Sequence, residues 1–170
     1  FQRLPNQEGA YWMTPEQVGQ KITAQLHHPV TEVHMVAGIH PKLDYQYYLD
    51  ILRAAKRARP AIHVKAFTMV ELDQIAKVAK KPLAEVLPEL VEAGLGSIPG
   101  GGAEVFDDRV HDEAFKGKIR SDQWLDVHRA AHELGINSNA TMLYGHIEER
   151  SDISHGMKRT EILCVRCSAH

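Results

Sequence analysis

The sequence has few cysteines, no long hydrophobic run and no excess of charge of one sign. Its two cysteines, Cys164 and Cys167, lie near the carboxyl terminus, give no disulfide framework and fit a reducing compartment. No apolar run approaches the roughly 20 residues that a membrane-spanning helix needs. The 20 Lys and Arg residues are scattered among 22 Asp and Glu residues, so no basic face for nucleic acid is indicated. We therefore expect a cytoplasmic protein that binds neither nucleic acid nor membranes.

The chain does not begin with methionine, and no pattern in it predicts a signal peptide. It begins at Phe1, which predicts either a trimmed start or an incomplete reading frame. No basic segment followed by an apolar one indicates secretion. A content of 44% hydrophobic and 25% charged residues is typical of one soluble globular domain.

Helices and strands alternate along the sequence with short connections, which predicts an α/β fold with a parallel sheet. Thr14 and Pro15 supply the start of a first helix, with Leu26 in its apolar stripe and Pro29 at its end. The helix near residue 122 is expected to be capped by Ser121 or Asp122. The predicted strands cover residues 31–37, 61–67, 95–99 and 136–143, and the later helices cover residues 44–59, 70–80, 82–93 and 122–134.

Alternate residues in three of these strands are polar, and polar side chains against a packed helix layer are costly. Lys65, Asn139 and Thr141 are therefore expected to face the interior of a barrel; exposure at an open sheet edge is the alternative. A complete (β/α)₈ barrel takes about 250 residues. The sequence thus predicts a partial (β/α) TIM-type barrel with about four or five parallel strands and outer helices.

Four blocks of the sequence form a recognisable set: GIHPKL at 38–43, KAFTMVE at 65–71, PGGGAEVF at 99–106 and SNATMLYGHIE at 138–148. Together they resemble the aminofutalosine synthases, a family of radical S-adenosylmethionine (SAM) enzymes. The resemblance extends from about Glu8 to about Glu149 and implies that residues 1–150 form the partial barrel, with 151–170 as an atypical tail. Cyclic dehypoxanthine futalosine synthases and the deazaflavin ring synthases share this barrel and are similar in the triple-glycine block.

The resemblance implies a specific reaction. A [4Fe-4S] cluster held by three cysteines binds SAM, and an electron donor such as flavodoxin or ferredoxin reduces it. The resulting 5′-deoxyadenosyl radical adds to 3-[(1-carboxyvinyl)oxy]benzoate and gives 6-amino-6-deoxyfutalosine, on the way to menaquinone. The family's cysteine motif belongs upstream of Phe1, so this chain alone is expected to be inactive. The alternatives are a cyclic dehypoxanthine futalosine synthase and a non-catalytic gene fragment.

The resemblance also implies candidate site residues. Two structural alternatives remain open. Lys65 could form an ion pair with Glu71 or Glu104, and the polar residues after the last strand could form a hydrogen-bonded network that only fixes their loop. The expected cofactor-binding residues are Gly38, His40, Gly101, Gly102 and Glu104. The expected substrate-binding residues are Lys65, Thr68, Glu71, Asn139, Thr141 and Tyr144. The expected catalytic residues are His146 and Glu148.

Eleven histidines raise a metal hydrolase as a rival class. His128 and His132 stand four residues apart on a predicted helix, but Arg129 replaces the glutamate of the zinc-protease pattern. We expect ordinary surface or capping histidines there and no metal ligands in this chain.

Overall fold

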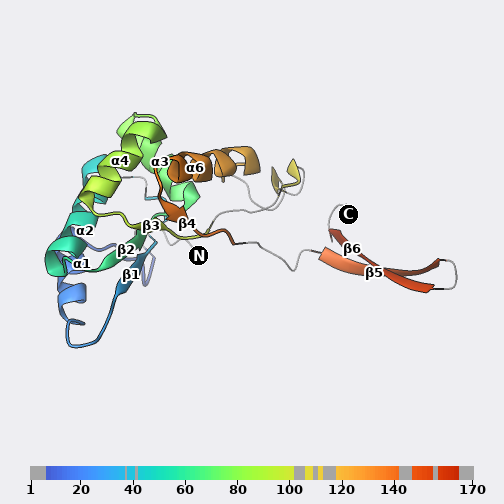
Figure 1. Ribbon diagram of the computed structural model, residues 1–170, viewed down its shortest axis with the longest axis horizontal. Coiled ribbons are helices and arrows are strands. Elements are labelled where there is room, and N and C mark those ends of the chain that lie inside the picture. Colours follow the sequence, from blue (N-terminus) through green and yellow to red (C-terminus); the bar gives the residue numbers. More distant parts are fainter. Residues whose placement is uncertain are drawn as a thin grey trace.

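The computed structural model (Figure 1) describes most of the chain. The described residues are 7–36, 38–40, 42–101, 106–108, 111–112, 118–141, 147–154 and 157–164. Within this part no helix is long and apolar enough to cross a membrane.

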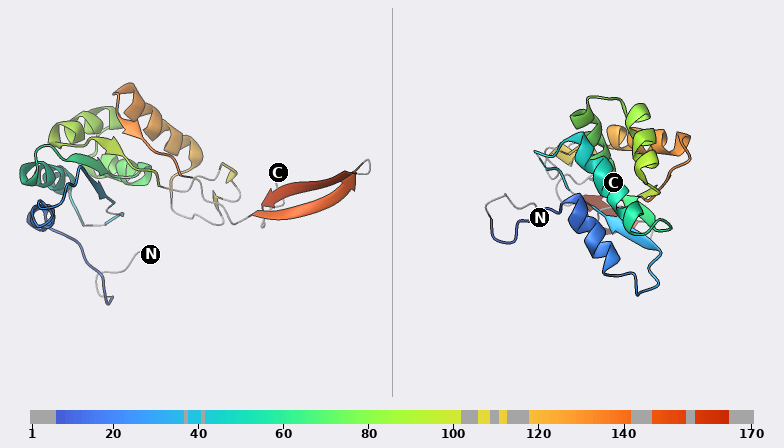
Figure 2. Two further views of the ribbon diagram at one scale, coloured as in Figure 1. Left: turned by 60° about the horizontal axis from the view of Figure 1, so that its bottom comes forward. Right: turned by 90° about the vertical axis from the view of Figure 1, so that its left-hand side faces the viewer.

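A four-stranded parallel sheet in the order β1-β2-β3-β4 forms the centre of the fold. The helices gather on one side of it, and the right-hand view of Figure 2 looks onto this helical layer. The partial (β/α) TIM-type barrel is therefore confirmed. The strands are β1 (Glu32–Met35), β2 (His63–Ala66), β3 (Ser97–Ile98) and β4 (Asn137–Ser138), and the helices are α1 (Pro15–Thr23), α2 (Tyr45–Ala58), α3 (Met69–Ala79), α4 (Leu83–Ala93) and α6 (Ser121–Glu133).

Short polar side chains begin three of these helices. Thr14 forms a capping box with Gln17 at α1, and Thr68 forms one with Glu71 at α3. The Asp44 carboxylate accepts the backbone N–H of Tyr47 at 2.9 Å and caps α2. These caps satisfy N–H groups that have no partner inside the helix. The predicted starts at Thr14 and Asp44 are thereby confirmed.

Three predicted boundaries are wrong. Helix α1 ends at Thr23, and Leu26, which was expected in its apolar stripe, is 46% exposed in the turn that follows. Helix α6 begins at Ser121, with Arg120 at the cap position and no side-chain cap. Strand β4 covers only Asn137–Ser138, because the neighbouring β3 offers only two residues for it to pair with.

The two faces of the sheet differ in polarity. The strand register aligns Lys65 with His34 on one side and with Ser97 on the other, so these three share one face. The opposite face carries Val64 and Ile98, which are almost completely buried under the helices. Lys65 therefore lies on the helix-free face, as the pattern predicts. Strand β4 ends at Ser138, so the predicted orientation of Asn139 and Thr141 stays a prediction.

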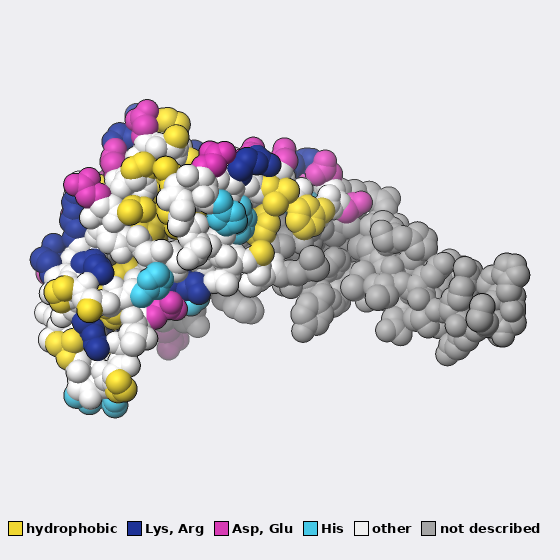
Figure 3. Space-filling model, in the orientation of Figure 1, with side chains coloured by type: hydrophobic (Ala, Val, Ile, Leu, Met, Phe, Trp, Pro, Cys, Tyr) yellow, Lys and Arg dark blue, Asp and Glu magenta, His cyan; other side chains and the backbone are white. Residues whose placement is uncertain are grey.

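The hydrophobic core lies between the sheet and helices α2, α3 and α4. Tyr48 of α2 packs edge-on against Phe67, with ring centroids 5.6 Å apart. On the surface shown in Figure 3, acidic and basic side chains are interspersed over the helices. The largest fully buried side chains are Tyr48, Phe67, Leu52, Ile62, Met69, Leu72, Ile75, Leu87, Leu90, Ile98, Val64 and Val86.

A separate antiparallel hairpin is formed by β5 (Ile147–Ser154) and β6 (Met157–Cys164). Figure 1 shows it apart from the parallel sheet. The hairpin begins before residue 151, and the predicted division of the chain at residue 150 stays a prediction.

The core makes a simple stability prediction. Leu52 is 0% exposed, so Leu52→Ala leaves a cavity and is expected to lower the free energy of unfolding by about 2–5 kcal/mol. The matched control, Leu26→Ala in an exposed turn, is expected to change it by no more than about 0.5 kcal/mol. Urea titration followed by circular dichroism measures both, and equal losses in the two variants would contradict the described core.

Candidate functional site

Loops from all four parallel strands meet at the carboxyl-terminal edge of the sheet. This edge carries the functional groups in (β/α) barrels. A Cβ atom placed on Gly101, after β3, would lie 2.6 Å from Cγ2 of Thr68, after β2. A Cβ atom on Gly100 would lie 2.7 Å from Cγ2 of Thr141, after β4. Glycine is therefore required at both positions, because the two threonine side chains fill the space that a larger residue would need.

Glu71 ties the first two loops together. Its side chain is buried, at 5% exposure. One carboxylate oxygen accepts the backbone N–H of Gly38, after β1, and the other accepts the backbone N–H of Thr68 at 2.7 Å. Charge-assisted hydrogen bonds of this kind are stronger than neutral ones. The structure thus shows Glu71 positioning the loops, while its direct contact with a substrate stays a prediction.

Phe67 makes the turn between β2 and α3. Its φ of 63° lies in the left-handed region, which is unusual for a bulky residue and costs about 1–3 kcal/mol. The side chain is fully buried, and the backbone N–H donates to the Met35 carbonyl at 3.2 Å. Packing therefore holds this strained turn, which directs the chain from β2 into the Thr68 cap. No residue pattern in the sequence indicates it.

Gly38 is the open point of the edge. Its φ is +66°, and no atom of the described residues lies within 4 Å of where a Cβ would be. Within that part of the chain, nothing fills the space beside this glycine. In the same loop, Nδ1 of the half-buried His40 accepts the backbone N–H of Lys42 at 3.2 Å.

Lys65 is half-buried on the helix-free face of β2. In the described part of the chain it forms no ion pair with Glu71, so that alternative is wrong for this structure. The other alternative partner, Glu104, lies outside the described residues. The Lys65 ammonium therefore has no ion-pair partner among the described residues.

The remaining predicted residues fall into three groups. Asn139 donates its backbone N–H to the Ile98 carbonyl at 3.0 Å, and its side chain is exposed, as is that of Thr141. Glu148 belongs to β5, whose side chains are not described. Four others lie outside the described residues: Gly102, Glu104, Tyr144 and His146.

Helix α6 is fastened to β4 by histidines. Nδ1 of His128 and Nε2 of His132 each lie 2.7 Å from the Ser138 hydroxyl oxygen. His128 is only 8% exposed, so its expected role as a surface or capping residue is wrong. The four-residue spacing put both rings on one side of the helix, but the sequence did not show that Ser138 faces them. Among the described residues no group of three or more His, Cys, Asp or Glu could hold a metal ion.

The same helix also holds the loop after β3. Trp124 donates its indole N–H to the Gly101 carbonyl at 3.2 Å. Helix α6 therefore holds the loop after β3 through Trp124 and strand β4 through Ser138.

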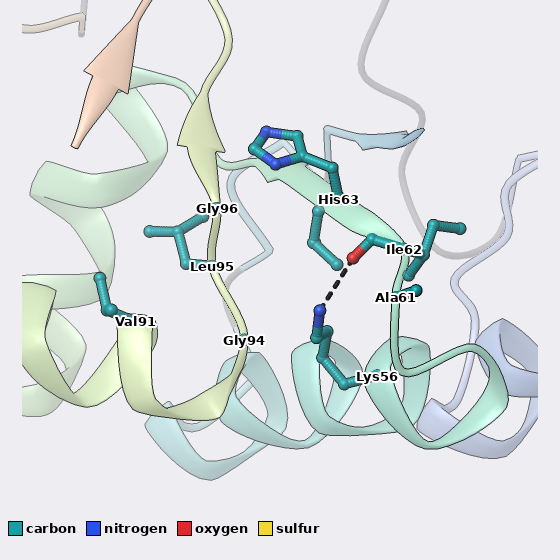
Figure 4. Close-up of a pocket in the computed structure, with 9 residues that line it drawn as sticks. Lys56, Ala61, Ile62, His63, Val91, Gly94, Leu95 and Gly96 are labelled. Atoms are coloured by element: carbon teal, nitrogen blue, oxygen red, sulfur yellow. Dashed lines mark hydrogen bonds between the residues drawn. The ribbon is translucent and has the colours of Figure 1, made fainter. Parts of the chain in front are cut away.

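A cavity of about 310 Å³ lies at the opposite edge of the sheet, where β2 and β3 begin (Figure 4). The Lys56 ammonium reaches from α2 and donates to the Ile62 carbonyl at 2.9 Å. A side chain on Gly94 would collide with the Lys56 stem, and one on Gly96 would lie 2.6 Å from the His63 ring. Residues at this end of such barrels serve stability. The cavity is thus separate from the carboxyl-terminal edge.

A family model and several known relatives point to the same superfamily. A model of the radical SAM superfamily matches residues 2–158. The chain is 44% identical over 164 residues to the aminodeoxyfutalosine synthase of Thermus thermophilus, covering 95% of the chain and 44% of that protein. It is 40% identical over 159 residues to the 5-amino-6-(D-ribitylamino)uracil--L-tyrosine 4-hydroxyphenyl transferase of Methanopyrus kandleri, covering 94% of the chain and 43% of that protein.

A third relative is the FO synthase of Nocardia farcinica, 37% identical over 151 residues, covering 89% of the chain and 18% of that protein. The chain therefore spans less than half the length of the curated relatives it matches.

The Glu71 contacts predict a loss of stability when the carboxylate is removed. Glu71→Ala leaves the backbone N–H groups of Gly38 and Thr68 without that partner and is expected to cost about 1–3 kcal/mol of unfolding free energy. Glu92→Ala, at an exposed position on α4, is the matched control and is expected to stay within about 0.5 kcal/mol. Urea titration measures both; a Glu71 variant as stable as the control contradicts the bridging role.

His128 predicts a pH dependence of stability. Burial, with a smaller contribution from His132, holds the pKa of His128 below its ordinary value. The folded state therefore binds this proton less readily than the unfolded state. The folded protein gains stability from keeping His128 neutral. This stabilisation is complete above about pH 6.5 and is lost as the pH falls below it.

We expect His128→Gln to weaken the loss of stability between about pH 7.5 and about pH 5.5, measured as the shift in urea midpoint. His27→Gln, at an exposed position, serves as the control and keeps the wild-type pH dependence. The interpretation fails if His128→Gln shows the same pH dependence as wild type.

Proposed function

The chain belongs to the radical SAM superfamily, and from that membership we propose that it forms part of the barrel of an aminodeoxyfutalosine synthase. The observation that carries the proposal is the 44% identity to the Thermus thermophilus enzyme over 95% of this chain. The proposed substrate is 3-[(1-carboxyvinyl)oxy]benzoate, and the proposed product is 6-amino-6-deoxyfutalosine, a precursor of menaquinone.

The residues of this chain do not fit the iron–sulfur cluster that the family implies. Such a cluster is held by cysteine thiolates, and the whole sequence contains two cysteines. Of these, Cys164 ends β6 in the separate hairpin. The cluster ligands would therefore have to come from outside this chain, and no step through the cluster is assigned to its residues.

The carboxyl-terminal edge of the sheet does fit a nucleoside cofactor such as SAM. No described residue fills the space beside Gly38, and Glu71 fixes the loop around it. When bound, SAM would supply the radical chemistry of this superfamily. We assign the following residues of this chain to its binding: Gly38, His40, Gly101, Gly102 and Glu104.

The substrate is proposed to lie beside the cofactor on the helix-free face. The Lys65 ammonium binds a carboxylate, while Asn139 and Thr141 hold polar substrate atoms without adding charge. His146 and Glu148 are proposed to move protons during the rearrangement. The remaining substrate-binding proposals are Thr68, Glu71 and Tyr144.

The surroundings of the reaction are part of the same proposal. The family resemblance supports a small-molecule substrate, a reducing cytoplasm and a one-electron donor such as flavodoxin or ferredoxin.

A second function is favoured by one observation. The identity to the Methanopyrus kandleri hydroxyphenyl transferase, at 40% over 94% of the chain, is only slightly lower. The helix-free face and the glycine loop are compatible with either reaction. The products of the two reactions differ, and therefore a product assay separates them.

A chimaera tests the proposal directly. This chain replaces the matching segment of the Thermus thermophilus enzyme, which supplies the rest of the barrel. We expect the chimaera, reconstituted with iron and sulfide and supplied with SAM and reductant, to form 6-amino-6-deoxyfutalosine, detected by mass spectrometry. The matched control is the same exchange into the Methanopyrus kandleri enzyme, which is expected to give no product with its own substrates.

Two results would contradict the proposal. One is a folded Thermus chimaera that carries its cluster but forms no product. The other is activity in the Methanopyrus chimaera alone, which assigns the second function instead.

A further inference from the structure

One row of polar side chains crosses the helix-free face of the sheet. The register aligns His34 with Lys65, Lys65 with Ser97, and Ser97 with Asn137. Residues aligned on neighbouring strands point to the same face and stand about 4.8 Å apart. The four residues therefore form a single row from one edge of the sheet to the other. Three of them, His34, Ser97 and Asn137, lie outside the sequence blocks that resemble the family.

Three members of the row are not used by the fold. The structure gives His34, Lys65 and Asn137 no side-chain hydrogen bond or ion pair within the part of the chain that it describes. The fourth member differs, because the Ser97 hydroxyl lies 2.7 Å from Nε2 of His63. Ser97 is thus occupied, whereas the other three have no side-chain partner among the described residues.

The charge around the row favours an anion. Lys65 is the one fixed charge among the four aligned residues. The nearest acidic residue in the register is Glu32, which aligns with His63 one layer towards the amino-terminal edge. Its carboxylate lies 3.9 Å from Nε2 of that histidine. Lys65 is also half-buried, which strengthens its attraction for a negative charge relative to a fully exposed lysine.

We infer that His34, Lys65 and Asn137 form a recognition row for an aromatic dicarboxylate. The Lys65 ammonium and the His34 imidazole, on adjacent strands, bind one carboxylate together. The Asn137 amide lies two strand spacings from Lys65, about 9.6 Å, and donates to the second carboxylate of the same ligand. This inference rests on the proposed function for the identity of the ligand, and it adds His34 and Asn137 as specificity-determining residues.

A direct titration tests the row in this chain. The ¹⁵N-labelled protein is titrated with isophthalate, a stable aromatic dicarboxylate, and in parallel with the uncharged isophthalamide. We expect saturable amide shifts in β1, β2 and β4 with isophthalate and none with isophthalamide. Shifts scattered over lysines elsewhere, or no saturable shifts at all, overturn the inference.

Substitutions assign the contacts. Lys65→Met is expected to weaken isophthalate binding at least about tenfold, and His34→Leu and Asn137→Ala several-fold each. Lys21→Met is the matched control, because it removes the same charge from an exposed position on α1 and is expected to bind like wild type. Lys65→Arg keeps the charge and is expected to retain most of the affinity, even if Lys65→Met folds poorly. Equal affinities in Lys65→Met and Lys21→Met overturn the row.

The chimaera separates this inference from the proposed function. Isophthalate binding to the row without product from the chimaera overturns the function and leaves the row. A productive chimaera in which Lys65→Met and His34→Leu leave the KM for the aromatic substrate unchanged overturns the row and leaves the function.

Discussion

The buried carboxylate of Glu71 is the contact on which the arrangement of the candidate site depends. It joins the loop after β1 to the start of α3 through two backbone N–H groups, so neither loop is placed by the sheet alone. The same cap positions Thr68, whose methyl group occupies the space beside Gly101. Thr141 in turn packs over Gly100 in that loop. A continuous series of contacts therefore runs from the first strand end to the last.

The two faces of the sheet have different roles: one packs against the helices, and the other carries the polar groups. Branched and aliphatic residues such as Val64 and Ile98 turn towards the helices and are almost fully buried. That burial stabilises the sheet from one side. Lys65, His34 and Asn137 on the other face have no side-chain partner among the described residues. The polar groups of the candidate site therefore come from side chains that are not part of the hydrophobic core.

Much of this could be predicted from the sequence, because the relevant signals are local. Thr14 and Asp44 predict helix starts through contacts within a few residues. The alternation of polar residues along the strands predicts the polar face of the sheet. What could not be predicted depends on distant contacts. The left-handed turn at Phe67 is held by packing against Tyr48, and the buried His128 bonds to Ser138 of the following strand. The exposure of Leu26 follows from a helix that ends before the apolar pattern does.

The short strand β4 has a consequence for how this fold can change. Two residues pair it with β3, whereas Ser138 is held from the other side by two histidines of α6. Trp124 of the same helix donates a hydrogen bond to Gly101 in the loop after β3. In recombination between related barrels, α6 and the strand after it must therefore be inherited as one cassette, because a crossover at Gly135 would separate the histidines from their serine.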